Sequence, residues 1–365
     1  MAYKISETTV IDNSSNVSGV KITASSNCIT NVGTTAERSS TPSSGSIRYN
    51  TTISSIEYYN GSEWISFSSI SPDPTPIGSR AVFGGGFTPG AVNTINYVTI
   101  ASTSNATDFG DLTLERYSLS ACASSTRGVF AGGRGPTTGL IDYITISSTG
   151  NAINFGNLLQ PRYGLAGCSN STRGVFGGGG APTAVRTIDY ITIATTGNAL
   201  SFDNLSPGAG GRGMGACASP TEGVFASPSG YLNYIEFATT GSEAYFGNLT
   251  VTRDYTAGAS SPTRGIFAGG IASLGARVTN IDYITFDTKS VSTYFGDLSV
   301  KRGKLGGASN SVRGVFAGGQ TSATVNSNII DYITIASSGN ATDFGDLITA
   351  TSNLTGTSDG HGGLG

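Results

Sequence analysis

Short stretches in which β-branched and aromatic residues alternate with polar ones recur between about residues 79 and 358. The clearest is Ile-Asp-Tyr-Ile-Thr-Ile, found at 141–146, 188–193 and 330–335, with variants at 95–100, 232–237 and 281–286. Alternation with a period of two is typical of half-buried strands. No stretch shows convincing helical periodicity. The pattern therefore predicts an all-β protein.

Three further landmarks recur with this stretch, in the same order from copy to copy. They are Gly-Val-Phe-x-Gly-Gly, Phe-Gly-Asp-Leu, and an Arg that precedes a strand of small residues. The Phe of the first landmark recurs every 42 to 49 residues, as Phe83, Phe130, Phe176, Phe225, Phe267 and Phe316. Four strands in a repeat of this length are the signature of a propeller blade. Residues 79–358 are therefore predicted to form a six-bladed β-propeller.

The ends of the repeat array predict how the ring closes. The copy that contains Phe83 has no small-residue strand before it, whereas residues 353–358, at the other end, have that pattern. We expect this C-terminal strand to complete the first blade, which leaves no open sheet edge between the first and last copies.

The ordered landmarks resemble kelch repeats. That family has a Gly-Gly pair ending a strand, then a Tyr, then an aromatic residue near a Leu, then an Arg before a small-residue strand. The corresponding residues are Gly132-Gly133, Tyr143, Phe155 with Leu158, and Arg162. The family's usual Trp is Phe in every copy. The resemblance implies the propeller fold and says little about function, because propellers host many functions.

Residues 1–68 have a different character. Gly45–Asn50 and Ile56–Ile65 predict two strands, with Asn60-Gly61 as a tight hairpin turn. Ile-Arg-Tyr-Asn followed by Tyr-Asn-Gly-x-x-Trp resembles a short module of bacteriophage tail-fibre and other virion appendage proteins. Residues 69–78 contain three prolines and predict a stiff linker. Residues 359–365 form a Gly-rich tail.

Composition narrows the functional classes. The 365 residues are 37% hydrophobic and only 12% charged, with a net charge of −3. Sparse, scattered Lys and Arg argue against nucleic-acid binding, which needs a basic face. No apolar run approaches the ~20 residues of a membrane helix. The N-terminus lacks a signal-peptide core, so synthesis in a cytoplasm is expected. No cofactor is predicted.

Candidate catalytic chemistry is weak. His361, the only histidine, is expected to be a solvated tail residue, and no Cys/His spacing suits a metal. Cys122, Cys168 and Cys217 fill one repeated slot and are interpreted as buried thiols, not disulfides. Glu222, Glu236 and Glu243 gather in the fourth repeat and support an alternative, glycan-degrading activity.

A repeated charge pattern also calls for an interpretation. Arg127, Arg173, Arg264 and Arg313 recur in register with Asp142, Asp189, Asp282 and Asp331 on the following strand. The fourth repeat has Glu222 and Asn233 instead, so both charges are lost together. We therefore expect each Arg to pair with the Asp of its own hairpin.

Two kinds of connection join the predicted strands. Those before the Phe strand and after Ile-Asp-Tyr are uniform, whereas those after Gly-Gly and around the landmark Arg vary. Variable loops on a rigid scaffold are where recognition usually occurs. The candidate ligand-binding residues are aromatic rings for stacking and arginines for carboxylates: Phe87, Tyr117, Arg134, Tyr163, Arg186, Tyr231, Tyr255 and Arg277.

Together these features predict a virion attachment protein. Residues 1–68 would dock on other virion proteins, and the propeller would bind a glycan or protein on the host surface. The alternatives are a surface-polysaccharide-degrading enzyme and a structural decoration or baseplate protein. Fibre modules of the resembled family are typically trimeric, so a homotrimer held by Tyr49, Tyr58 and Trp64 is expected. Alternatively, residues 1–68 fold only against another virion protein.

Overall fold

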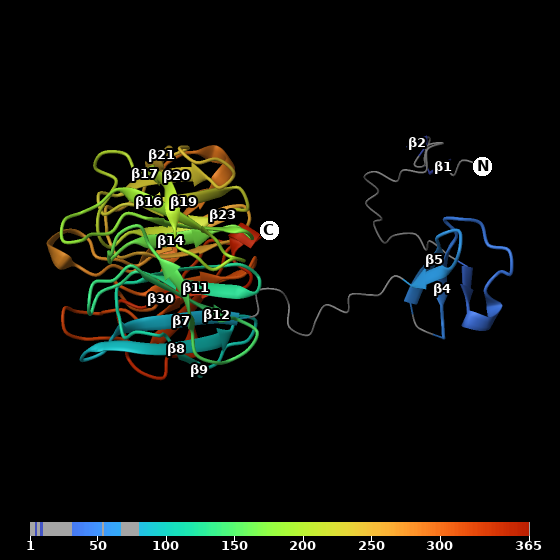
Figure 1. The fold of residues 1–365 in the computed structure, drawn as a ribbon, viewed down its shortest axis with the longest axis horizontal. Helices are drawn as coiled ribbons and strands as arrows, with labels where there is room; N and C mark the ends of the chain where they lie inside the picture. The colour runs from blue at the N-terminus through green and yellow to red at the C-terminus, as the bar shows by residue number, and fades with distance from the viewer. Residues whose placement is uncertain (1–3, 6–7, 10–30, 53–54, 67–79, 365) are drawn as a thin grey trace. The chain divides into compact units, whose positions relative to one another are not determined.

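The computed structural model describes residues 4–5, 8–9, 31–52, 55–66 and 80–364. The chain divides into two compact units, residues 1–74 and 75–365 (Figure 1). The predicted linker, residues 69–78, lies outside the described residues, as does Cys28. Each unit is described by itself.

The larger unit contains six four-stranded antiparallel sheets, one for each sequence repeat. Sheet 1 contains β30 (Thr355–Ser358), β7 (Arg80–Phe87), β8 (Ala91–Thr99) and β9 (Thr107–Asp111). Sheet 2 contains β10 (Ser120–Ala123), β11 (Arg127–Ala131), β12 (Leu140–Thr145) and β13 (Ile153–Asn157). Sheet 3 contains β14 (Ala166–Ser169), β15 (Arg173–Gly177), β16 (Thr187–Thr192) and β17 (Leu200–Asn204).

The remaining sheets repeat this plan. Sheet 4 contains β18 (Gly215–Ala218), β19 (Glu222–Ala226), β20 (Tyr231–Glu236) and β21 (Ala244–Asn248). Sheet 5 contains β22 (Ala257–Ser260), β23 (Arg264–Ala268), β24 (Asn280–Thr285) and β25 (Thr293–Asp297). Sheet 6 contains β26 (Gly306–Ser309), β27 (Arg313–Ala317), β28 (Ile329–Thr334) and β29 (Thr342–Asp346). Short 3₁₀ turns occupy Ser273–Gly275, Phe286–Thr288 and Gly362–Leu364.

The first strands of the six sheets contact one another in cyclic order, from β30 through β10, β14, β18, β22 and β26 back to β30. Small residues in these strands permit the close approach. The apolar core lies between neighbouring sheets. Phe109 and Leu112 of the sheet 1 repeat, for example, join one cluster with Phe130 and Ile144 of sheet 2. The arrangement is propeller-like, as the repeats predict.

The C-terminal strand completes sheet 1, as predicted. β30 pairs antiparallel with β7, with Thr355 opposite Gly84 and Ser358 opposite Ala81 (Figure 1). Segments almost 280 residues apart in sequence thereby form one sheet. Arg80 N–H, at the start of β7, also donates to Asp359 Oδ1, just after β30.

The predicted pairing of Arg127 with Asp142 is wrong, and so are its counterparts. Arg127 lies opposite Thr145. Its guanidinium instead packs over the Tyr143 ring, 4.6 Å from the centroid, and donates to the Ile193 and Ala194 carbonyls of the next repeat. Tyr143 in turn meets Phe155 edge-on, with 6.0 Å between the ring centroids. The arginines therefore join neighbouring repeats.

The aspartates pair with the landmark arginines instead. Four such pairs are fully buried: Arg116–Asp142 at 2.9 Å, Arg162–Asp189 at 2.8 Å, Arg253–Asp282 at 3.0 Å and Arg302–Asp331 at 2.6 Å. Each arginine also donates to the carbonyl of the Phe in its own sheet's second strand, as Arg162 does to Phe176. Each pair thus anchors the variable connection that enters a sheet.

The smaller unit contains a sheet in the order β3 (Asn31–Gly33), β4 (Ile47–Asn50), β5 (Ser55–Tyr59) and β6 (Trp64–Ser66). β3 and β4 are parallel and the other pairs are antiparallel. A 3₁₀ turn spans Thr35–Glu37, and β1 (Lys4–Ile5) pairs with β2 (Thr8–Thr9).

The interior of this small sheet is polar. Glu57 is fully buried and accepts hydrogen bonds from Arg38 at 2.6 and 3.1 Å and from Asn50 at 3.1 Å. Arg48 lies 3.6 Å from the same carboxylate. The Arg38 hydrogen bond is the main cause that lowers the pKa of Glu57. The motif residues Arg48 and Asn50 therefore build an ionic centre.

Candidate binding face at the channel mouth

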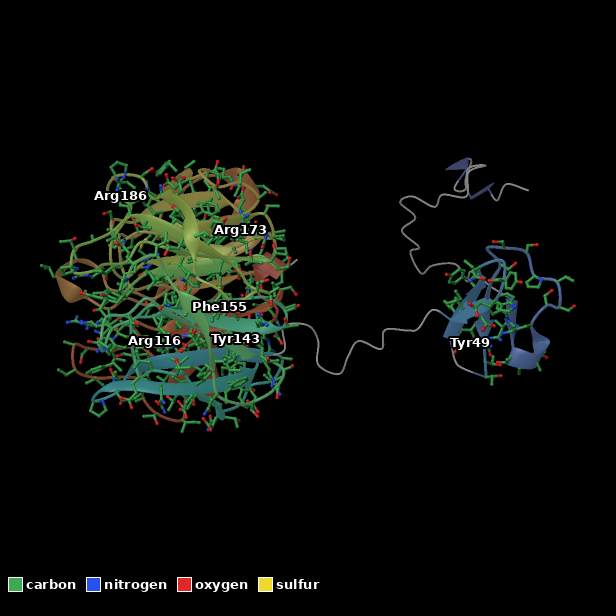
Figure 2. All side chains as sticks on the ribbon, in the orientation of Figure 1. Tyr49, Arg116, Tyr143, Phe155, Arg173 and Arg186 are labelled. Atoms are coloured by element: carbon green, nitrogen blue, oxygen red, sulfur yellow. The ribbon has the colours of Figure 1, made fainter. Side chains whose placement is uncertain are left out.

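The variable connections lie together at one end of the six first strands. Short β-bridges join the connection after Gly-Gly to the one around the landmark Arg, for example Tyr117 with Arg134 and Asp254 with Ile271. Figure 2 places Arg116 and Arg186 toward one side of the unit and Arg173 toward the other. These connections form a common face, as the sequence predicts.

A ring of backbone hydrogen bonds surrounds the centre of this face. Six equivalent residues, one before each first strand, donate in turn to their neighbour's carbonyl: Ser118, Gly164, Gly213, Tyr255, Lys304 and Asn353. The N···O distances are 2.6 to 3.1 Å, and the last residue closes the cycle with the first. All six have positive φ.

Tyr255 and Lys304 hold this conformation at a cost. Left-handed backbone disfavours residues with a Cβ by roughly 1–2 kcal/mol, and sheets 3 and 4 use glycine at the same position. Glycine would therefore adopt this backbone conformation at lower cost. The presence of Tyr255 and Lys304 at these two positions must have a reason other than the backbone conformation.

The ring opens into a narrow channel between the first strands. Its cavity of about 90 Å³ is lined by residues from all six sheets, many of them Gly, Ala or Ser. A space of this size holds only a few water molecules. A larger ligand must therefore bind on the face around the mouth.

Aromatic and cationic side chains surround the mouth. Arg134 and Arg212 both lie over the Tyr163 ring, at 5.1 and 4.8 Å from its centroid. Lys304 Nζ lies 5.3 Å from the Tyr255 centroid. Arg277 and Lys304 act electrostatically on the half-buried Asp254. We call these seven residues the mouth cluster: Arg134, Tyr163, Arg212, Asp254, Tyr255, Arg277 and Lys304.

The cluster carries four cations and a single carboxylate. Burial raises the pKa of Asp254 to about 6, and its Oδ1 has no hydrogen-bond partner. Burial, followed by the neighbouring Arg277, lowers the pKa of Lys304. The Nε atoms of Arg212 and Arg277 are also buried without partners. The mouth is therefore electropositive and has unused hydrogen-bonding groups.

An open pocket of about 570 Å³ adjoins the cluster. Arg134, Tyr163, Thr137, Gln160, Pro161, Ala181 and Pro182 line it. None of these residues is acidic. The volume falls in the ~300–1,000 Å³ range of small-molecule sites, and the lining combines flat rings with amide, hydroxyl and guanidinium donors.

Six of the eight predicted binding residues lie around the mouth, and two do not. Phe87 and Tyr117 meet edge-on at 5.2 Å beside the cluster. Tyr231 instead pairs with Tyr245 at 6.4 Å, and Arg186 donates to the Leu205 carbonyl. The sequence interpretation missed Arg212 and Lys304. Arg212 follows a longer connection that obscures its alignment with Tyr163, and Lys304 occupies a position read as part of a strand.

The uniform connections have a structural role. In sheet 2, Gly150 N–H donates to the Phe109 carbonyl and Asn151 Oδ1 accepts from Asp111 N–H, both in the sheet 1 repeat. The same bonds recur around the unit, as at Gly197 with Phe155 and at Gly339 with Phe295. These connections join neighbouring sheets and are uniform for that reason.

The Gly-rich tail folds against the other end of the channel. His361 was predicted to be solvated, and this is wrong: it is half-buried, with Nε2 2.9 Å from the Ala123 carbonyl and 3.3 Å from Ser169 Oγ. Gly363 N–H donates to Nδ1, so the geometry fits a neutral ring with its proton on Nε2. Burial lowers the pKa of His361.

The glutamates of the fourth repeat have separate partners. Glu222 forms an ion pair with Lys289, whereas Glu243 accepts from Asn233 at 2.6 Å and from Ser206 at 2.8 Å. Glu236 is exposed opposite Glu222. Cys122, Cys168 and Cys217 are free and buried, as predicted, and burial raises their pKa values.

In the smaller unit, the predicted oligomerisation residues occupy both faces of the sheet. Tyr49 and Tyr58 lie on one face, with the exposed Ile47. Trp64 lies on the other, 5.6 Å from Tyr59 and 5.9 Å from the Arg48 guanidinium.

Within the described ranges, no three His, Cys, Asp or Glu side chains gather as a metal site, and no helix there has the length and apolarity to cross a membrane. No protein-family model matches the sequence, and no curated protein is significantly similar to it.

Proposed function

We propose that this chain is a virion attachment protein of the bacteriophage tail-fibre type, which binds a glycan or protein on the host surface through the face at the channel mouth. The observation that carries the proposal is the mouth cluster. Partly exposed aromatic and cationic groups gather on the one face whose connections vary. The connections of the other kind are occupied in joining the sheets.

The finer architecture is part of the proposal. The six sheets are interpreted as the blades of a closed kelch-like propeller. Support comes from the cyclic contacts of the first strands and from the unbroken ring of six hydrogen bonds. A rigid ring of this kind holds binding loops at fixed separations, which lowers the ordering cost of recognition.

The smaller unit is proposed to attach the propeller to the virion as a homotrimer. One face of its sheet is apolar: Val32 and Ile47 are 63% and 51% exposed, and Tyr49 and Ile65 are partly exposed beside them. The opposite face contains the Glu57 ionic centre. Packing of the apolar faces of three copies would remove Val32, Ile47 and Tyr49 from water, whereas Trp64 would stay within its own subunit.

Adsorption of labelled full-length protein to a panel of bacterial strains tests the function. Saturable adsorption without release of sugar supports attachment. Depolymerisation of surface polysaccharide would favour the enzymatic alternative, and absence of adsorption to every strain would favour a structural virion component. The subunit mass is 37.0 kDa. Mass measurement by light scattering should give three subunits for the full chain, and a monomer would refute the trimer.

A further inference from the structure

The charge of the variable connections differs from that of the whole protein. The chain has 20 basic and 23 acidic residues. Leaving aside the four buried arginines that pair with aspartates, the variable connections contain six basic residues: Arg134, Arg212, Arg277 and Lys304 in the mouth cluster, and Arg186 and Lys301 outside it. Only Glu115 and Asp254 oppose them there. An acidic protein thus presents a basic face at one location.

Two of these basic residues, Arg134 and Arg212, lie over the ring of Tyr163. Two guanidinium groups lie within about 5 Å of one ring centroid. Cation–π attraction stabilises each by about 0.5–1 kcal/mol at an exposed site, but the two like charges repel each other. No carboxylate lines the adjoining pocket to offset that repulsion. A bound anion would offset that repulsion.

The pocket also indicates the chemistry around that anion. Pro161, Pro182 and Tyr163 offer apolar ring surfaces, and Thr137 and Gln160 offer hydroxyl and amide groups. A sugar ring presents C–H groups on its faces and hydroxyls at its edge, so it suits this mixture better than an extended peptide does. Guanidinium forks bind carboxylates in bidentate fashion.

We propose that the mouth cluster binds an acidic polysaccharide with carboxylate-bearing sugar rings, and that Arg134, which lines the pocket, and Arg212, on the same tyrosine ring, contact carboxylates along the polymer. The inference rests on the proposed attachment function and names its ligand class. Tyr163 is a positioning residue that holds both guanidiniums. Cations repeated at Arg277 and Lys304 suit a polymer that carries one carboxylate per repeat.

Binding of the full-length protein to linear polyuronides and polysialic acid, measured by biolayer interferometry at two salt concentrations, provides the test. At least one polymer should bind saturably, and chemical reduction of its carboxyls to alcohols should abolish binding. The Arg134→Gln/Arg212→Gln variant should bind at least about tenfold more weakly, because each loses a charge-assisted hydrogen bond. Lys301→Gln changes the same kind of charge on an exposed residue outside the cluster and should bind normally.

Two comparisons separate a specific site from a general basic patch. Tyr163→Phe should retain binding, whereas Tyr163→Leu should weaken it severalfold, because only an aromatic ring holds the two guanidiniums. Polyglutamate should bind at least tenfold more weakly than the acidic polysaccharide. Equal binding of polyglutamate, or an unchanged affinity of the double-Gln variant, would overturn the proposal.

Failure of the proposed ligand class can be distinguished from failure of the proposed attachment function. If the protein adsorbs to cells while every acidic polymer fails to bind, the ligand class is wrong and the attachment function stands. If it adsorbs to no strain, the attachment function itself fails.

Discussion

The buried pair of Arg162 and Asp189 should behave as a unit in which either single change is costly. At the observed 2.8 Å, two unit charges attract by about 6 kcal/mol at an effective dielectric constant of about 20. Desolvation of both ions cancels most of this energy. The net contribution of the intact pair is therefore small, whereas an unpaired member would leave an uncompensated buried charge.

The chain offers a natural replacement for this pair. Sheet 1 has Asn96 at the position of Asp189, and Thr351 at the position of Arg162 in a connection of equal length. We therefore expect Arg162→Thr and Asp189→Asn each to lower the free energy of unfolding by roughly 3–5 kcal/mol. The double variant should lose clearly less than the sum, with a coupling of about 2 kcal/mol or more.

Denaturant unfolding followed by far-UV circular dichroism measures these differences in the larger unit. Trp64 is the only tryptophan, so its fluorescence reports the smaller unit separately and should not change. Arg186→Thr, which removes an exposed arginine bound to one carbonyl, is the matched control and should cost less than about 1 kcal/mol. If the double variant were as unstable as the sum of the singles, the paired-charge explanation would be refuted.

Three further outcomes follow from particular contacts. Glu57→Gln should destabilise the smaller unit by about 3 kcal/mol. The fold lowers the pKa of Glu57, so the ionised carboxylate should stabilise the wild-type unit above about pH 4.5, and this contribution should be lost as the pH falls further. Trp64 fluorescence is the readout, and Glu63→Gln is the exposed control. Lys289→Ala should destabilise the larger unit in denaturant melts by roughly 1–2 kcal/mol. Adding Glu222→Arg to Lys289→Ala should restore stability, because it places an Arg over the Tyr of the same hairpin, as in sheet 2. Failure of that rescue would contradict the argument. The fold also lowers the pKa of His361, so the packing of the tail should hold above about pH 6.5 and loosen as the pH falls. Faster hydrogen exchange at Gly362–Leu364 would report this change. His361→Gln should remove the pH dependence, and persistence of that dependence in the variant would exclude the histidine as its cause.

The repeat made the strands of the larger unit predictable, because four landmarks in a constant order determine which stretches pair. The partners of its charges were not identified from the sequence, although a signal was present. The landmark Arg and the Asp are present together in sheets 2, 3, 5 and 6. They are lost together in sheet 1, as Thr351 and Asn96, and in sheet 4, as Gly211 and Asn233. The apparent loss of Arg at Glu222 has a different cause.

Lys289 explains that exception. Its Nζ lies 4.5 Å from the Tyr234 centroid and donates to the Phe286 carbonyl at 2.9 Å. Arg127 makes the same kind of contacts in sheet 2, with Tyr143 and the Ile193 carbonyl. The cation comes from the following repeat instead of from the same hairpin, and Glu222 pairs with it. An alignment of repeats compares only equivalent positions. It therefore cannot reveal that Lys289, at a non-equivalent position of the next repeat, supplies the cation.

The smaller unit shows a second limit of pattern reasoning. Alternation predicts which residues share a face of a strand, but it does not predict which face is covered. Arg48, Asn50 and Glu57 would ordinarily be assigned to solvent, and here they form the covered side because Arg38 completes their ionic network. The apolar residues Val32 and Ile47 are consequently exposed.

The distribution of variation over the larger unit supports a division of labour between its two ends. At one end, every connection must meet a neighbouring sheet through backbone bonds such as Gly150 with Phe109, so changes there would break several joints at once. At the other end, the buried Arg–Asp pairs anchor four of the six connections, and only at their base. The loop beyond an anchor is free to change in length and chemistry without loss of the fold. Under the proposed attachment function, a change of ligand therefore needs changes at the mouth alone, where Arg134 and Arg212 lie over the Tyr163 ring.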